Sequence, residues 1–106
     1  MVSPATPGVN PEPMVLRPPR VLDLTACSGL SASLFDAYQV RRPVVVDLSE
    51  VAVVDSSALA VLVGAHRRGR AADCSVTVIN PTARVDAVLR MTGLGRLLDV
   101  RREAAL

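Results

Sequence analysis

A short cluster of acidic and hydroxyl residues, Asp55-Ser56-Ser57, is the part of the sequence whose residue types could carry chemistry. It precedes a segment with apolar residues at helical spacing, so Ser56 falls at a predicted helix start. A phosphate on Ser56 would meet free amides and the positive end of the helix dipole, and the Asp55 carboxylate would repel it. Since phosphorylation adds roughly two negative charges and needs no cofactor, this position suits a charge-based switch. Asp and Ser also cap helices in many proteins, so these residues alone favour a plain capping cluster.

A hydrolase-like set of Ser56, Asp55 and His66 is the enzymatic alternative. Ser56 and His66 are ten residues apart. On one helix, this spacing corresponds to about 15 Å at about 1.5 Å per residue, so the two side chains do not meet. We expect His66 to end the apolar stripe of the helix, half-buried. The sequence contains neither a metal-ligand cluster nor a glycine-rich phosphate loop, so we predict a protein that is not an enzyme, with no cofactor and no metal.

The elements that would position this cluster alternate between strand and helix patterns. A β-branched run at residues 44–48 predicts an interior strand covered on both faces, and residues 75–79 predict another. Weaker patterns at residues 14–16, 21–24 and 97–100 indicate short strands, and residues 51–54 are expected to be extended or irregular. Pro18-Pro19 confines the first strand to a sheet edge, because proline has no amide donor.

Three helices are predicted between these strands. The first is short, from Ser28 or Ser31 to about Val40, and ends before Pro43. The second starts at the cluster and runs to about Arg68, with Gly69 as its stop. The third starts at Asn80-Pro81, with Asn80 as the cap, buries Val85, Val88 and Leu89, and ends before Gly93.

This alternation predicts a single α/β domain over residues 14–102, with a mixed, mostly parallel sheet and helices packed against it. The length of 106 residues leaves room for one domain. Residues 1–13 contain four prolines and are predicted to be a disordered tail.

From Pro43 to Val100 the sequence resembles the STAS domain family, and in particular its anti-sigma factor antagonists. Four segments carry the resemblance in the expected order: the central strand at 44–49 (VVVDLS), the phosphorylation loop and following helix at 53–62 (VVDSSALAVL), the next strand and helix start at 76–85 (VTVINPTARV), and the C-terminal helix and closing strand at 89–100 (LRMTGLGRLLDV).

The resemblance implies that Ser56 is phosphorylated by a partner anti-sigma factor, itself a serine kinase that uses ATP, and that a phosphatase reverses the modification. It also implies partner-binding roles for Asp23, Asp55, Ser57 and Leu59, with Ser57 capping the helix. The unphosphorylated protein would bind the anti-sigma factor and release a sigma factor, regulating transcription in a stress response. The number of subunits stays open.

The sequence departs from the usual family pattern at two places. Ala58 stands where the family commonly has Gly, and Arg20-Val21 stands where it commonly has Gly-Glu. STAS domains also occur as small subunits of lipid-transport ABC assemblies, which often lack a phosphorylatable serine at the key position. Ser56 therefore favours the sigma-regulatory alternative. Binding of a small ligand is a third alternative that the sequence leaves open.

The amino-acid composition limits the cellular locations and the binding partners that we expect. The net charge is +2, all 12 basic residues are arginines, and Phe35 and Tyr38 are the only aromatics, so nucleic-acid binding is not predicted. The longest apolar run, residues 58–65, is too short to span a membrane, and no secretory pattern precedes it. Cys27 and Cys74 are expected to be reduced thiols in the cytoplasm, with a redox role left open.

Overall fold

The structure, a computed structural model, describes residues 12–102. The predicted proline-rich tail lies almost wholly outside the described residues. In chain order the elements are β1 (Met14–Leu16), β2 (Val21–Leu22), α1 (Leu24–Gln39), β3 (Val44–Asp47), β4 (Val53–Val54), α2 (Ser56–Ala71), β5 (Val76–Ile79), α3 (Ala83–Thr92), the 3-10 helix η1 (Leu94–Leu97) and β6 (Asp99–Arg101).

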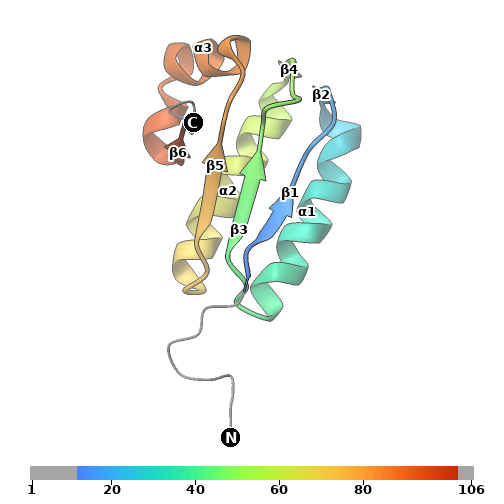
Figure 1. The fold of residues 1–106 in the computed structure, drawn as a ribbon, viewed down its shortest axis with the longest axis vertical. Helices are drawn as coiled ribbons and strands as arrows, with labels where there is room; N and C mark the ends of the chain where they lie inside the picture. The colour runs from blue at the N-terminus through green and yellow to red at the C-terminus, as the bar shows by residue number, and fades with distance from the viewer. Residues whose placement is uncertain (1–11, 103–106) are drawn as a thin grey trace, which may run out of the picture.

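Two parallel sheets organise these elements (Figure 1). The larger has the order β1-β3-β5-β6, and β2 pairs with β4 in a second, two-stranded sheet. Every strand pairing in the described residues is parallel. The predicted α/β fold with a mostly parallel sheet is therefore confirmed, as is the edge position of β1.

The helices α1 and α2 lie side by side on one face of the larger sheet (Figure 1). Val44 and Val46 of β3 point into the core under these helices and are at most 1% exposed. Val45 points to the opposite face and is only half-buried. The prediction that β3 is interior is confirmed, and its second face, with Val45 half-buried and Asp47 buried, is covered less completely than the first.

The first helix is longer than predicted. It begins at Leu24, because Asp23 adopts an extended backbone and its Oδ1 accepts a hydrogen bond from the amide of Ala26 at 3.1 Å. This side-chain cap satisfies a donor that the first turn would otherwise leave free. The predicted start at Ser28 or Ser31 is therefore one turn or more too late.

The second helix runs past its predicted end at Arg68. Gly69 does not stop it, because the helix continues to Ala71. Gly69 is instead a close-packing position: a Cβ at Gly69 would lie 2.3 Å from the carbonyl oxygen of Cys74. Since that separation is far below van der Waals contact, only glycine fits between α2 and the start of β5.

The third helix begins at Ala83, not at Asn80-Pro81. Thr82 is its cap: the Thr82 hydroxyl accepts from the amide of Val85 at 3.4 Å and donates to the carbonyl of Val51 at 2.8 Å. The helix ends at Thr92, before Gly93 as predicted, and Gly93 follows it as the C-cap with a φ of +75°. The last strand begins at Asp99, two residues later than predicted, because η1 occupies Leu94–Leu97.

Candidate functional site

Ser56 is the first residue of α2, and its side chain is exposed. Its hydroxyl makes no hydrogen bond with any residue in the described range. The cap of α2 is Asp55, whose Oδ1 accepts from the amide of Ala58 at 2.9 Å. The prediction that Ser57 caps the helix is therefore wrong. Because Asp55 provides the cap, the Ser56 hydroxyl does not cap α2 and lies exposed at the helix start.

The second oxygen of Asp55 reaches the other helix. Asp55 Oδ2 accepts from the amide of Leu24, the first residue of α1, at 3.2 Å. One carboxylate thus holds the N-termini of α1 and α2, while Asp23 caps α1 from its own side. Both helix starts carry partial positive charge, which attracts a nearby anion. The carboxylates of Asp23 and Asp55 would repel the same anion.

The short β2–β4 sheet brings these segments together. Val21 pairs with Val53, Leu22 pairs with Val54, and the amide of Asp55 donates to the carbonyl of Leu22 at 3.3 Å. The chain then turns from each strand directly into a helix, so α1 and α2 begin next to each other (Figure 1). The predicted site residues Asp23, Asp55, Ser56 and Ser57 consequently lie on neighbouring segments at this end of the fold.

Leu59 is the exception among the predicted partner-binding residues. Its side chain is 7% exposed and packs in the hydrophobic core, so it offers almost no surface to a partner. Three apolar side chains that the sequence analysis missed are exposed at this end of the fold instead. Leu24 is 69% exposed, Val21 45% and Val53 43%. We call Ser56 together with Leu24, Val21 and Val53 the switch surface.

Cys27 lies in the core beneath this end of α1. Burial raises the pKa of its thiol, and the nearby charges of Asp55 and Asp23 raise it further. Burial also raises the pKa of Cys74, whose Sγ donates to the carbonyl of Arg42 at 2.9 Å. Both cysteines are free thiols, and both are held in the protonated, unreactive form at neutral pH.

The hydrolase-like set is not assembled. Ser56 and His66 lie on the same helix, α2, as predicted, which separates them by about 15 Å along the axis. His66 is half-buried, also as predicted, and its Nδ1 has no hydrogen-bond partner in the described chain. Among residues 12–102, no cluster of His, Cys, Asp and Glu could hold a metal ion. No helix in the same range is both long and apolar enough to cross a membrane.

Comparison with known proteins places this geometry in a family. Residues 8–99 match the family model described as "Mlab, STAS domain". The match covers most of the chain, and the protein therefore belongs to the STAS domain family. No curated protein matches the sequence significantly.

Solved structures of anti-sigma factor antagonists share the fold. The unphosphorylated form of SpoIIAA superposes with a TM-score of 0.72 at 23% identity, covering 92% of this chain and 86% of that one. The phosphorylated form of SpoIIAA from Bacillus gives a TM-score of 0.64 at 22% identity, with 86% and 84% covered. A STAS-domain anti-sigma factor antagonist from Planctomyces limnophilus gives 0.69 at 21% identity, with 83% and 80% covered.

Proposed function

We propose that this protein is an anti-sigma factor antagonist that works by partner switching. In the unphosphorylated state it binds an anti-sigma factor, itself a serine kinase, and so frees a sigma factor for transcription. The kinase phosphorylates Ser56, which ends the binding, and a phosphatase restores the active form. The proposal assigns the chain a regulatory role in the cytoplasm and no catalytic step of its own.

The observation that carries the proposal is the environment of Ser56. Its hydroxyl is exposed and uncommitted, because Asp55 performs the capping. The apolar members of the switch surface, Leu24, Val21 and Val53, are exposed at the same end. A transient protein interface can form on apolar area that surrounds a single polar group. Burial of the apolar area supplies the binding affinity, and a change of charge on the central group alters that affinity.

Phosphorylation of Ser56 acts on this surface through charge. A phosphate adds roughly two negative charges next to the Asp55 carboxylate. Inside an interface these charges must lose their water, and an acidic or apolar partner surface does not compensate for that loss. We therefore expect the phosphorylated form to bind the anti-sigma factor much more weakly than the unphosphorylated form.

The test compares partner capture by wild type, Ser56→Ala and Ser56→Asp from a lysate of the native cell, with partners identified by mass spectrometry. Wild type and Ser56→Ala should capture an ATP-binding anti-sigma kinase, and Ser56→Asp should lose it. Incubation of the purified kinase with ATP should add one phosphate to wild type and none to Ser56→Ala. Equal capture of that kinase by all three proteins would contradict the proposal, as would phosphate transfer to Ser56→Ala.

A second candidate function has its own supporting observation. The matching family model carries the description "Mlab, STAS domain", and STAS subunits of lipid-transport ABC assemblies are the alternative considered above. Under this alternative the same capture experiment would recover a transporter ATPase. Retention of that ATPase by both wild type and Ser56→Asp would favour the transport role over partner switching.

A further inference from the structure

A pocket of about 420 Å³ opens between α3, η1 and β6, on elements distinct from the switch surface. Its charged lining consists of three arginines and one carboxylate: Arg90, Arg96, Arg102 and Asp86. One negative charge neutralises one of the three positive charges, so the pocket keeps an excess of about two. An excess of this sign in a concave site attracts anions, because the low-dielectric walls concentrate the field.

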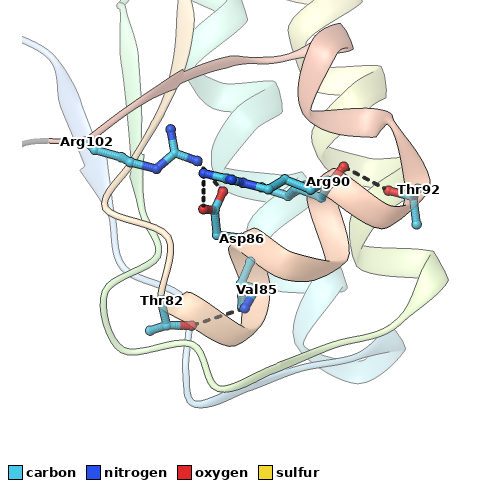
Figure 2. A network of polar contacts seen from close by, with 7 residues as sticks. Thr82, Val85, Asp86, Arg90, Thr92 and Arg102 are labelled. Carbon is cyan, nitrogen blue, oxygen red and sulfur yellow. Dashed lines mark hydrogen bonds and ion pairs between the residues drawn. The ribbon is translucent and has the colours of Figure 1, made fainter.

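Asp86 orients two of the arginines (Figure 2). Its side chain is only 17% exposed, and its Oδ2 accepts from Arg90 at 3.1 Å while its Oδ1 accepts from Arg102. The two guanidinium groups approach this carboxylate from opposite sides (Figure 2). Each guanidinium carries five N–H donors, so the ion pairs fix its position and leave donors for a ligand.

Arg96 is the third arginine, and it differs from the other two. It is exposed and makes no ion pair with any residue between 12 and 102. Gly93 and Gly95 line the pocket beside it. A Cβ at Gly93 would meet nothing within 4 Å, so the space next to this turn is open. A ligand there would gain the uncommitted charge of Arg96 without displacing a side chain.

The C-terminal end of α3 points its carbonyls toward this region, and their partial negative charge would oppose an anion. The chain satisfies several of them internally. The Thr92 hydroxyl donates to the carbonyls of Val88 at 2.8 Å and Leu89 at 3.3 Å, and the amide of Gly93 donates to the carbonyl of Arg90 at 3.2 Å. These bonds weaken the opposing field, so the arginines dominate the pocket.

We propose that this pocket binds a phosphate group carried by a small organic molecule or by a lipid headgroup. Guanidinium groups match phosphate oxygens with paired, charge-assisted hydrogen bonds. The volume falls within the range of about 300–1,000 Å³ that is typical of small-molecule sites. Leu89, Leu98 and Val100 complete the lining and provide an apolar wall for the organic part. The site does not depend on the chemistry of Ser56.

The first experiment titrates the full chain with pyrophosphate at low salt and follows backbone amides by NMR. Saturable shifts are expected at Gly93, Gly95 and Arg96. Arg96→Gln should weaken binding by at least about tenfold, the cost of one charge-assisted hydrogen bond. Arg67→Gln is the matched control, because Arg67 is exposed on α2 and does not line the pocket. Equal loss in both variants, or no saturable shift with pyrophosphate at millimolar concentration, would overturn the proposal.

The second experiment separates the two sources of phosphate. Co-sedimentation with vesicles that contain phosphatidic acid, but not with phosphatidylcholine vesicles, would assign a lipid headgroup if Arg96→Gln abolishes it. Saturable binding of glycerol 3-phosphate without vesicle binding would assign a soluble ligand. Vesicle binding that persists in Arg96→Gln and is lost in Arg67→Gln would place the contact elsewhere and reject this pocket.

Discussion

The amide of Leu24 donates a hydrogen bond to the side chain of Asp55 across 31 positions of sequence, at 3.2 Å. Because the other oxygen of Asp55 caps α2 at the amide of Ala58, one carboxylate ties two helix starts together. The contact lies next to Ser56, so the residue that would be modified and the residue that joins the helices are neighbours in the chain.

Removing the Asp55 carboxylate should destabilise the fold. Asp55→Ala loses both the α2 cap and the bond to Leu24, and we expect the free energy of unfolding to fall by about 1–3 kcal/mol. Urea denaturation measures this change. Asp36→Ala, at an exposed carboxylate within α1, is the control and should change stability by less than about 0.5 kcal/mol. A similar decrease in the free energy of unfolding in both variants would contradict a special stabilising role for Asp55.

Two glycine-to-alanine substitutions in helices should have opposite effects. Gly69→Ala places a Cβ 2.3 Å from the Cys74 carbonyl oxygen, so overpacking should cost about 1–3 kcal/mol or more. A Cβ at Gly29 meets nothing within 4 Å, so Gly29→Ala should stabilise α1 by about 0.5–1 kcal/mol. Thermal denaturation of the two variants measures both changes in stability. A stabilised Gly69→Ala would contradict the close packing of α2 on β5.

The buried carboxylate of Asp47 should make stability depend on acid pH. Burial opposes its ionisation, but hydrogen bonds from Ser49 and from the Arg17 guanidinium outweigh burial and lower its pKa. A lowered pKa in the folded state means that the stabilisation is present above the unfolded-state pKa of about 3.9. It is lost as the pH falls through the folded-state pKa.

Asp47→Asn should therefore reduce stability at neutral pH and flatten the decline in stability as the pH falls from about 5 through the lowered folded-state pKa. Urea denaturation at several pH values measures both effects. Glu50→Gln, at an exposed carboxylate nearby, serves as the control and should keep the wild-type pH profile. A variant Asp47→Asn whose profile matches that of wild type would show that this carboxylate does not set the acid limit.

Both thiols should react slowly in the native protein. Cys27 and Cys74 are 4% and 2% exposed, and burial is the main cause of their raised pKa values. Little thiolate is then present near neutral pH, and reagents have little access to it. Labelling with a disulfide reagent should be slow in buffer and complete in denaturant. Rapid labelling of either cysteine in the folded protein would reopen a redox role for it.

The apolar part of the switch surface should carry partner affinity if the proposed function holds. Leu24→Asp replaces a 69% exposed side chain, and it should weaken capture of the anti-sigma kinase by at least about tenfold, as expected of a central apolar contact. Met91→Asp is the control, because Met91 is 86% exposed on α3. Equal capture by the two variants would mean that the partner binds away from the start of α1.

The strands and the position of Ser56 were predictable because their signals are local. The β-branched runs that form β3 and β5 read as strands without any partner, and Asp55-Ser56 reads as a helix start. Two helix boundaries were predicted wrongly because composition alone was misleading. Gly69 has the composition of a helix stop, yet α2 continues to Ala71, and Gly69 is instead the position where the helix packs closely against Cys74.

The start of α3 failed for a related reason. Asn80-Pro81 has the composition of a helix start, but Asn80 adopts a φ of +53°, which is a turn conformation rather than a cap. Thr82, tied to Val51 through its hydroxyl, takes the capping role instead. The choice between the capping candidates Asn80 and Thr82 thus depends on a residue 31 positions away from Thr82.

The composition of the switch surface was the least predictable part of the site. Leu22 is fully buried while Val21 is 45% exposed, a period-2 alternation that two residues alone cannot reveal. Only the pairing of β2 with β4 turns Val21 and Val53 outward together. Leu59 was predicted to bind a partner because it is close to Ser56 in the sequence, but its side chain packs in the hydrophobic core.

Parallel pairing also dictates the order in which this protein can form during synthesis. Parallel strands cannot be joined by a tight hairpin, and β1 has no partner until residue 44 has been made, since Met14 pairs with Val44. Likewise, Val21 cannot pair in the second sheet until Val53 has been made, and the Leu24 amide cannot form its hydrogen bond until Asp55 has been made. A chain released before these later segments are made would therefore leave its apolar strands unpaired and exposed.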